Sequence, residues 1–449
     1  MEQNDEVKST TVAATPTQAE EAQARWGWVE RTVWTERMLT RLTSGEPANR
    51  VWFSLMDKTY AAANLQSAFG KVWRNGGSAG ADGQTVAHFE REAEAELARL
   101  HEQLREGSYR PQPVRRAWID KPGSKEQRPL GIPAVRDRIV QGALRHVLEP
   151  IFETDFAEHS YGFRPGRGAK DALRRVDRLL KTGHVWVVDA DLKSYFDTIP
   201  HDRLLALVKA RVADGRVLAL VERFLRAGVL EELNDWQPTE RGTPQGGVIS
   251  PLLANLYLNP LDHQMAQGGY EMVRYADDFV ILCRDEAEAR VALAAVATWV
   301  SGAGLILHPD KTRVVDATQR GGFDFLGYHF ERGMKWPRAK SLKKLRERLR
   351  TKTSRLDGRS LPDIVTDVNR TLRGWYGYFQ HSKANVFTAI DGYVRRRLRS
   401  LLQWRQGGRG QGKGLAHHRW PNEWFAQRGL LCLAAEHVWT RTIVELRTH

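Results

Sequence analysis

The sequence predicts an α+β protein in which amphipathic helices flank a small β-sheet. In residues 270–283, two short apolar runs enclose a polar centre, which is typical of a β-hairpin. Residues 185–188 form another apolar run, short enough to be a buried strand. Residues 286–301 and 387–404 repeat their apolar side chains at helical spacing. Strands and long helices therefore occupy separate stretches of the chain.

Length and charge indicate a multidomain protein that binds nucleic acid. The chain has 449 residues, which is enough for two to four domains. It carries 68 Lys and Arg against 54 Asp and Glu, a net charge of +14. The excess is concentrated, with 13 cations against 4 acids in residues 335–373 and 11 against 3 in residues 395–449. Such basic segments favour a nucleic-acid partner.

The two cysteines, Cys283 and Cys432, supply neither a disulfide framework nor a Cys-rich zinc site, and they favour reducing cytosol. No apolar run approaches the roughly 18 residues of a membrane span, and the N-terminus is acidic rather than basic. We therefore expect no membrane contact and a cytoplasmic location, in the bacterial cytosol or with the nucleoid.

The N-terminal part is expected to be mostly helical after a disordered leader at residues 1–24. Periodicity predicts helices over residues 26–43, 51–73, 88–104 and 135–156. Residues 117–128 show a strand-turn-strand pattern with Lys121 and Arg128 at its ends. These two cations can hold a triphosphate, because Arg offers two parallel donors and Lys a point charge. A solvated surface explains such a pair equally well.

The polar centre of the hairpin contains two adjacent carboxylates, Asp277 and Asp278. Adjacent carboxylates repel one another, and this repulsion is tolerated at a solvated surface or around a divalent cation. Mg²⁺ suits the second case, because it takes one or two protein carboxylates and fills its shell with water and substrate phosphates. Since Asp also favours ordinary surface turns, the pair alone leaves both interpretations open.

Another two acids, Asp189 and Asp191, follow the strand at residues 185–188. In an extended strand both point to the same face, so spacing does not decide which of them meets the hairpin acids. Three converging carboxylates could hold two metal ions about 4 Å apart, the arrangement that catalyses phosphoryl transfer. The residues therefore suggest nucleotidyl transfer.

Nine motifs extend this pattern along most of the chain. In order they are GGSAGADG (76–83), KPGSKEQRPLGIP (121–133), YGFRPGRG (161–168), VVDADLKSYFDTI (187–199), GTPQGGVISPLLANLYL (242–258), RYADD (274–278), HPDKT (308–312), FDFLGYHF (323–330) and LRGWYGYF (372–379). Over residues 50–449 the chain thus resembles the reverse transcriptase/maturase proteins encoded by group II introns. One such motif is weak evidence, whereas nine collinear motifs are specific.

The resemblance implies an α+β right-handed polymerase with fingers, a palm built on an antiparallel sheet, and a helical thumb. After the leader (1–24), the expected regions are an N-terminal extension with fingers (25–184), the palm with the catalytic centre (185–335), the thumb or maturase domain (336–405), and a basic linker with a DNA-binding tail (406–449). The tail lacks paired cysteines, so no HNH endonuclease domain is expected.

The resemblance also implies an RNA-directed DNA polymerase with two Mg²⁺ ions. It favours Asp191 over Asp189 as the first metal ligand, with Leu192 beside it. Asp277 and Asp278 complete the metal site, and Asp277 is expected to be the more direct ligand of the pair.

Further site residues follow from the same resemblance. Phe196 is expected to clash with a ribose 2′-OH, which predicts a preference for dNTPs. The nucleotide-binding residues are expected to be Lys121, Arg128, Phe196, Gln245, Gly246 and Lys311. The primer and template are expected to contact Arg164, Gly327, Tyr328 and Trp375. The turn around Arg164 could hold backbone phosphates, but a packed corner explains it equally well.

The implied partners are group II intron RNA, an RNA template with a DNA primer, target DNA and dNTPs. The oligomeric state stays open, a homodimer included. Two alternatives stay open as well. One is a splicing factor without polymerase activity. The other is a domesticated relative that serves DNA repair, CRISPR spacer capture or phage defence.

Overall fold

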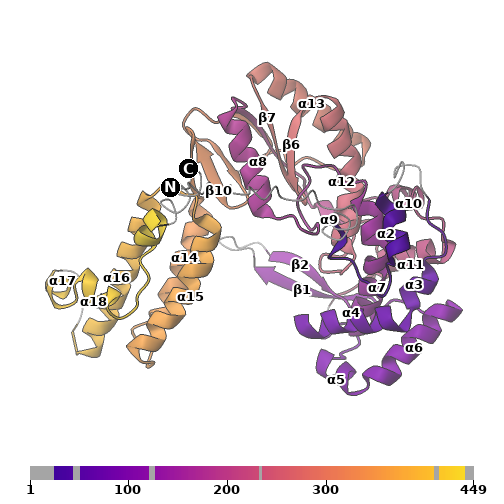
Figure 1. The fold of residues 1–449 in the computed structure, drawn as a ribbon, viewed down its shortest axis with the longest axis horizontal. Helices are drawn as coiled ribbons and strands as arrows, with labels where there is room; N and C mark the ends of the chain where they lie inside the picture. Colours follow the sequence, from indigo (N-terminus) through magenta and orange to yellow (C-terminus); the bar gives the residue numbers. More distant parts are fainter. Residues whose placement is uncertain (1–24, 44–50, 121–126, 232–234, 409–413, 440–449) are drawn as a thin grey trace, which may run out of the picture.

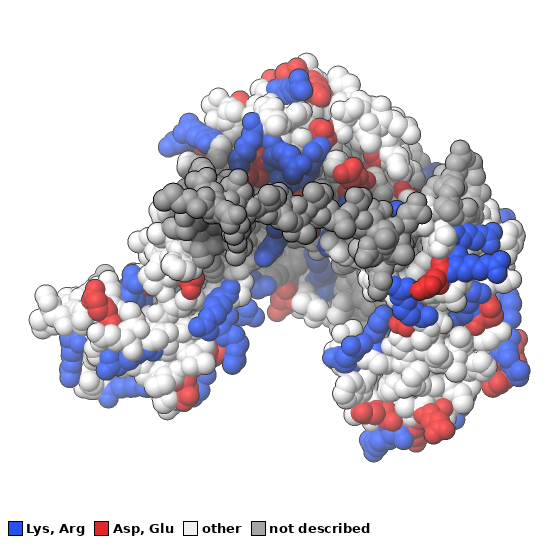
Figure 2. All heavy atoms as spheres, viewed as in Figure 1, with Lys and Arg blue, Asp and Glu red and all other residues white. Residues whose placement is uncertain are grey.

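The computed structural model describes residues 25–43, 51–120, 127–231, 235–408 and 414–439. The elements form an N-terminal helical group, a central sheet and a C-terminal helical lobe (Figure 1). In the space-filling view the molecule is hollowed between the N-terminal group and the C-terminal lobe (Figure 2). The predicted leader at residues 1–24 and Lys121 lie outside the described residues.

In the N-terminal group, α3 (Met56–Tyr60) and α4 (Ala62–Asn75) pack against the long buried helix α7 (Val135–Glu153). Its other helices are α2 (Glu36–Thr43), α5 (Val86–Arg91) and α6 (Ala93–Glu106). A four-stranded sheet in the order β2-β1-β4-β5 adjoins them, with β1 (Val114–Asp120), β2 (Gln127–Ile132), β4 (Val229–Glu231) and β5 (Asp235–Gln237). The antiparallel pair β1–β2 confirms the predicted strand-turn-strand pattern.

The central sheet has the strand order β6-β7-β3-β8, and all its neighbouring strands are antiparallel. Its strands are β3 (Trp186–Asp191), β6 (Glu271–Tyr275), β7 (Asp278–Cys283) and β8 (Arg313–Asp316). The hairpin β6–β7 and the buried strand β3 confirm two of the sequence predictions. The sheet is the antiparallel platform expected of a polymerase palm.

Both faces of the central sheet are buried because its strands carry apolar side chains on both sides. Phe279 and Ile281 of β7 belong to the large core shared with α12 (Ser250–Gln267) and α13 (Glu286–Gly302). Val280 and Leu282, which alternate with them, pack with α8 (Ala169–Lys181) instead. This alternation is the two-residue period of a β-strand. Short helices α9 (Tyr195–Thr198), α10 (His201–Lys209) and α11 (Gly215–Leu225) connect β3 to β4.

The C-terminal lobe follows a small antiparallel sheet in the order β11-β10-β9. These strands are β9 (Phe323–Phe325), β10 (Tyr328–Glu331) and β11 (Met334–Pro337). The lobe contains α14 (Ala339–Lys352), α15 (Leu361–Phe379), α16 (Asn385–Arg405), α17 (Leu415–Arg419) and α18 (Asn422–Ala426). Residues from α17 and α18, among them Ala416 and Phe425, share one hydrophobic core with α14–α16. This part of the predicted tail therefore packs on the predicted thumb.

Several predicted helices differ from the observed ones. The predicted helix at 26–43 is helical as α2 only from Glu36. The predicted helix at 51–73 is interrupted at Ala61, whose ψ of 129° is extended, and the one at 88–104 is interrupted at Glu92. Side-chain periodicity survives such breaks, because the apolar face resumes after one residue.

Candidate active site

The strand register brings the acids of two motifs together at one end of the central sheet. Asp191, the last residue of β3, is directly opposite Asp278, the first residue of β7. Directly paired residues of antiparallel strands have their side chains on the same face. Asp277 occupies the turn immediately before β7. Three carboxyl groups that are distant in sequence thus gather at the turn of the β6–β7 hairpin.

The two hairpin acids, Asp277 and Asp278, have raised pKa values. Burial, followed by the charges of Asp277, Asp189 and Asp191, raises the pKa of Asp278 to about 7. Burial is also the main cause that raises the pKa of Asp277, and the charge of Asp191 adds to it. Each shift means that the protein environment disfavours the negative charge. A cation placed among these oxygens would remove that penalty.

Two of the acids pair with side-chain cations from the segment after α13. Lys311 Nζ donates a hydrogen bond to Asp191 Oδ2 over 2.5 Å, and Arg313 lies 3.3 Å from Asp189. The prediction for Lys311 was a contact with nucleotide phosphates, and the structure places it on an acid of the same site. Within the described part of the chain, no three His, Cys, Asp or Glu side chains are close enough to form a metal cluster. The carboxylate oxygens of Asp191, Asp277 and Asp278 are nevertheless the kind of ligand that a hard divalent cation takes.

The turn that carries Asp277 is held by a buried arginine. Arg274 is 0% exposed and forms a two-pronged ion pair with Asp262 of α12, with donor–acceptor distances of 2.7 and 2.5 Å. Its third nitrogen donates to Asn255 Oδ1 at 3.0 Å and to the carbonyl of Ala276 at 2.8 Å. Ala276 has a φ of +60°, a left-handed conformation that is unfavourable for a residue with a Cβ atom. Arg274 therefore fixes the strained residue directly before the acids.

The segment at residues 159–164 supports the same turn from outside the sheet. A Cβ atom on Gly162 would come within 2.3 Å of the Ala276 nitrogen, so only glycine permits this approach. The Gly162 carbonyl accepts a hydrogen bond of 2.6 Å from Asn255, which also contacts Arg274. The turn is thus enclosed by glycine on one side and by a charged network on the other.

Arg164 is part of this support rather than a nucleic-acid contact, which corrects the prediction. Its side chain is 2% exposed and pairs with Glu153 at 2.7 Å. It also donates to the carbonyls of Ala157 and Ser160. Phe163 beside it has a φ of +57° and stays 46% exposed, 6.4 Å from the ring of Tyr275. The basic and aromatic turn is therefore the packed corner that the sequence left as an alternative.

The predicted nucleotide-binding residues come from several elements. Arg128 on β2 is exposed, and its charge acts on Asp277 in the direction that lowers the pKa of that acid. Phe196 is half-buried against the large core, with its ring 5.5 Å from that of Tyr195. Gln245 donates to Asp197 Oδ2 at 3.2 Å. Lys121 lies outside the described residues, so its predicted contact stays a prediction.

Gly246 is needed because two main chains touch at this point. Its φ is +116°, and a Cβ atom there would lie 2.3 Å from the Gly131 carbonyl. The neighbouring Gln245 carbonyl accepts a hydrogen bond of 2.6 Å from the Gly131 nitrogen. The turn of the 242–258 motif is therefore bonded directly to the β1–β2 hairpin.

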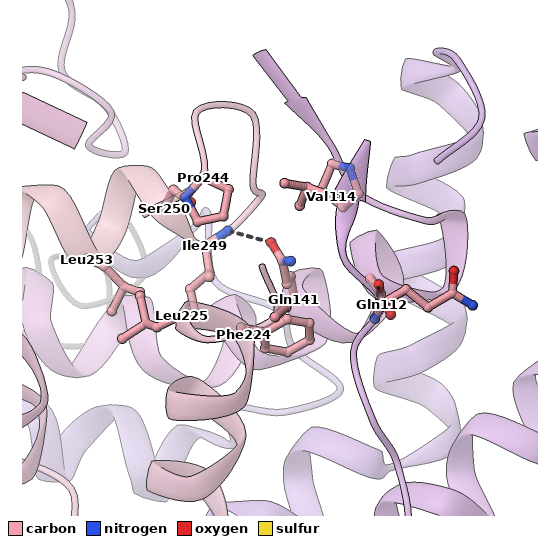
Figure 3. Close-up of a pocket in the computed structure, with 12 residues that line it drawn as sticks. Gln112, Val114, Gln141, Phe224, Leu225, Pro244, Ile249, Ser250 and Leu253 are labelled. Atoms are coloured by element: carbon pink, nitrogen blue, oxygen red, sulfur yellow. Dashed lines mark hydrogen bonds between the residues drawn. The ribbon is translucent and has the colours of Figure 1, made fainter. Parts of the chain in front are cut away.

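A polar side chain of α7, which the sequence analysis did not identify, anchors this turn. Gln141 of α7 accepts hydrogen bonds from the main-chain nitrogens of Val248 at 2.7 Å and Ile249 at 3.4 Å. Figure 3 shows Gln141 pointing toward the Ile249 nitrogen, and both residues line a small cavity with a volume of about 10 Å³. A cavity of this size holds at most one water molecule. Gln141 supports the turn, and the cavity beside it is too small for a substrate.

The predicted primer contacts have different surroundings. Tyr328 is 2% exposed and its hydroxyl donates to the Tyr378 carbonyl at 2.8 Å, so its side chain cannot meet a primer as predicted. Trp375 is half-buried, with its ring 4.8 Å from that of Phe379. Gly327 has a φ of +85° at the turn between β9 and β10, and its primer contact stays a prediction. Leu192 is buried, and its main chain forms an isolated antiparallel β-bridge with that of Leu307.

Sequence reasoning did not identify Arg274, Gly162 or Gln141 as site residues. Arg274 precedes the acids within its motif, but an arginine on a strand is more often exposed than buried. The glycine of YGFRP carried a usable signal, because a glycine between aromatic residues can mark a close main-chain approach.

An antiparallel sheet with acids at one strand end and at the adjoining hairpin turn, between a helical group and a helical lobe, defines the palm of a template-copying polymerase. The comparisons with known proteins agree. Residues 119–330 match the reverse transcriptase (RNA-dependent DNA polymerase) family, and residues 342–420 match the maturase-specific domain of group II introns.

Individual relatives point to the same family. Protein YkfC of Escherichia coli (strain K12) is 35% identical over 292 residues, which cover 56% of this chain and 76% of YkfC. The group II intron-encoded protein LtrA of Lactococcus lactis subsp. cremoris is 44% identical over 177 residues, which cover 39% of this chain and 29% of LtrA. This chain belongs to the family of group II intron reverse transcriptase/maturase proteins.

Within the described ranges, no helix is both long and apolar enough to cross a membrane.

Proposed function

We propose that the chain is an RNA-directed DNA polymerase that copies group II intron RNA into cDNA. The observation that carries the proposal is the pairing of Asp191 with Asp278 beside Asp277, where burial and mutual repulsion raise the pKa of both hairpin acids. Carboxyl groups whose pKa is raised in this way are candidates for a functional site. Family membership supplies the reaction class.

In the proposed reaction, Asp191, Asp277 and Asp278 hold two divalent cations, for which Mg²⁺ is the natural choice. Bound there, the ions would activate a primer 3′-OH and stabilise the departing pyrophosphate. The protein's own part is to fix the carboxylates through Arg274 and Gly162. It also supplies Lys311, which reaches Asp191 and is close enough to the site to meet a triphosphate oxygen.

Arg128 and Lys121 are proposed to hold the triphosphate, and Gln245 and Gly246 to line the sugar side. Phe196 is proposed to exclude a ribose 2′-OH. Its main chain is fixed, since its carbonyl accepts a hydrogen bond of 2.6 Å from the Thr243 nitrogen. A ring held by a fixed main chain is suited to discriminate by size.

A second activity, assistance of intron splicing, has its own support. Residues 342–420 match the maturase-specific domain, and the same segment is rich in Lys and Arg. Figure 2 shows basic side chains on the edge of the C-terminal lobe that faces the recess. The proposed partners are therefore intron RNA, an RNA template with a DNA primer, and target DNA. The proposed location is the bacterial cytosol.

Primer extension on an RNA template tests the polymerase. The wild type is expected to extend a DNA primer with dNTPs and Mg²⁺, and not with rNTPs. The double variant Asp277→Asn with Asp278→Asn should lose at least about a thousandfold in rate while it still binds RNA. Asp57→Asn, which removes an exposed acid of α3, is the control and should retain full activity.

The outcomes separate the alternatives. No extension by folded, RNA-binding wild type would favour the splicing factor without polymerase activity. Retained splicing by the double Asn variant would show that the two activities use different groups. Phe196→Ala should gain rNTP incorporation, whereas Phe196→Tyr should keep the dNTP preference. If both variants keep the dNTP preference, the proposed role of Phe196 is refuted.

A further inference from the structure

Arg338 occupies the junction between the central part of the molecule and the C-terminal lobe. It is the residue directly before α14, and its main-chain nitrogen donates to the Gly327 carbonyl at 2.9 Å. Ser341 Oγ donates to the same carbonyl at 3.2 Å. Tyr378 of α15 donates to the neighbouring Leu326 carbonyl at 2.8 Å. The first helix of the lobe therefore begins on the β9–β10 turn.

The side chain of Arg338 differs from those of the two buried arginines near the site. Arg274 and Arg164 are both saturated by carboxylates and carbonyls. Arg338 is partly buried, but within the described part of the chain its guanidinium has neither a hydrogen bond nor an ion pair, and its Nε is buried without a partner. A buried donor without a partner is costly, which indicates a group reserved for a ligand.

The charge of Arg338 reaches the acids at the end of the central sheet. It acts on Asp278 and on Tyr378, in each case in the direction that lowers the pKa, against the larger effect of burial. Arg128 acts in the same way on Asp277, but from β2 of the N-terminal group. The two acids of the hairpin thus have one arginine on the side of the proposed nucleotide site and another on the side of the C-terminal lobe.

We propose that Arg338 binds a phosphodiester of the primer strand close to its 3′ end and so positions the 3′-OH over the acids. This inference rests on the proposed polymerase function. A phosphodiester carries one negative charge and two free oxygens, which match the donor fork of a guanidinium. The nucleotide triphosphate is assigned to Arg128, and Arg338 lies where the C-terminal lobe begins, so the proposal assigns the primer strand to Arg338.

The main alternative for Arg338 is a counter-ion for Asp278 with no contact to nucleic acid. Such a role would change the protonation of the acids and leave the affinity for the primer unaffected. A phosphate contact would instead make the affinity depend on one particular phosphodiester. The two roles therefore predict different responses to removal of a single primer charge.

The test measures the Kd of the full chain for an RNA template–DNA primer duplex without Mg²⁺. Three primers each carry one neutral methylphosphonate, at the first, second or third linkage from the 3′ end. The variants are Arg338→Gln and Arg338→Lys. Arg332→Gln is the matched control, since Arg332 is an exposed arginine at the opposite end of β10.

For the wild type, one of the three methylphosphonates should raise Kd about tenfold or more, the effect of one charged hydrogen bond. Arg338→Gln should raise Kd by a similar factor with the unmodified primer and lose all sensitivity to that linkage. Arg338→Lys should retain part of the sensitivity to that linkage, and Arg332→Gln should behave as the wild type. This pattern supports the proposal.

Two results would overturn the contact. In the first, Arg338→Gln and each methylphosphonate weaken binding additively, so no linkage depends on Arg338. In the second, Arg338→Gln leaves Kd unchanged and shifts the pH profile of extension, which assigns Arg338 to Asp278 alone. Because Kd is measured without catalysis, an inactive wild type would refute the polymerase and still leave the binding pattern to be read. Thermal unfolding checks that both Arg338 variants are folded.

Discussion

Two turns of the molecule contain a non-glycine residue with positive φ, and they are held in different ways. The turn between β6 and β7 has Ala276 at a φ of +60° and is fixed by the fully buried pair of Arg274 and Asp262. The turn between β9 and β10 has Leu326 and Gly327 at φ values of +45° and +85° and is held by neutral hydrogen bonds from the C-terminal lobe. The first turn is anchored within one core, whereas the second couples two parts of the molecule.

This difference suggests a division of labour. Nucleotidyl transfer requires carboxylates fixed to a fraction of an ångström, and a buried ion pair with a saturated hydrogen-bond network supplies that rigidity. Contact with a moving duplex requires a junction that can adjust. Neutral hydrogen bonds at the boundary of a lobe are weaker and can be exchanged.

The largest effect is expected at Arg274. Arg274→Met leaves Asp262 buried without a partner and should lower the free energy of unfolding by about 3–5 kcal/mol. It should also abolish extension, because Ala276 loses its donor. Urea unfolding and single-turnover extension measure the two effects. Arg313→Met, which removes an exposed partner of Asp189, should cost at most about 1 kcal/mol.

A double variant separates folding from positioning. Arg274→Met with Asp262→Leu removes both charges, so most of the lost stability should return. Activity should not return, since nothing replaces the donor to the Ala276 carbonyl. Recovery of activity together with stability would mean that the buried pair serves the fold alone, and the contrast between the two turns would fail.

The next effect is a pH dependence of the metal-free protein. The pKa of Asp278 is about 7 in the folded state, against about 3.9 in an unfolded chain. A raised carboxyl pKa means that the folded state binds the proton more tightly. Stability should therefore be highest below pH 4 for this group and fall as the pH rises through 7, by at most about 4 kcal/mol.

Asp278→Asn should remove this slope, and so should saturating Mg²⁺ in the wild type. The comparison of the wild type with Asp278→Asn cancels other titrating groups, including Asp137, whose pKa burial raises to about 6, and His146, whose pKa burial lowers to about 4. Thermal unfolding between pH 4 and pH 9 provides the measurement. Parallel curves for the two proteins would contradict the burial of the Asp278 charge.

Gly162→Ala should cost about 1–3 kcal/mol, because the added methyl overlaps the Ala276 nitrogen and forces the main chain to move. The expected signature is a fall in kcat at unchanged KM for the dNTP. Gly374→Ala is the matched control. Nothing lies within 4 Å of the added atom there, and alanine favours the helix α15, so stability should rise slightly. An equally active Gly162→Ala would remove this residue from the support of the turn.

Much of the fold followed from local patterns. Each of five elements shows its own spacing of apolar side chains within one segment of the sequence. These elements are the hairpin β6–β7, the strand β3 and the helices α7, α13 and α16. Helix breaks at Ala61 and Glu92 escaped detection, because the apolar period continues across them. The meeting of Asp191 with Asp278 depends on register between strands about ninety residues apart, which no local pattern contains.

The supports of the site were harder to predict than the acids. An acid pair at a hairpin turn is visible in the sequence because its repulsion needs an explanation. The burial of Arg164 and Tyr328 depends on neighbours from other elements, Glu153 and Tyr378, so their type suggested nucleic-acid contact instead. Residue type indicates what a side chain can bind, and only packing decides whether it is accessible.

The smallest effect concerns the second turn. Tyr378→Phe removes the hydrogen bond to the Leu326 carbonyl and should lower the free energy of unfolding by about 1 kcal/mol. Tyr393→Phe is the control, because its hydroxyl donates to the Arg346 carbonyl at an exposed site and should matter less. If the second turn is the adjustable one, Tyr378→Phe should weaken primer binding and leave the maximal rate of nucleotide addition unchanged. A fall in that rate as large as the one in Gly162→Ala would show instead that both turns hold the acids, and that the junction is as rigid as the centre it adjoins.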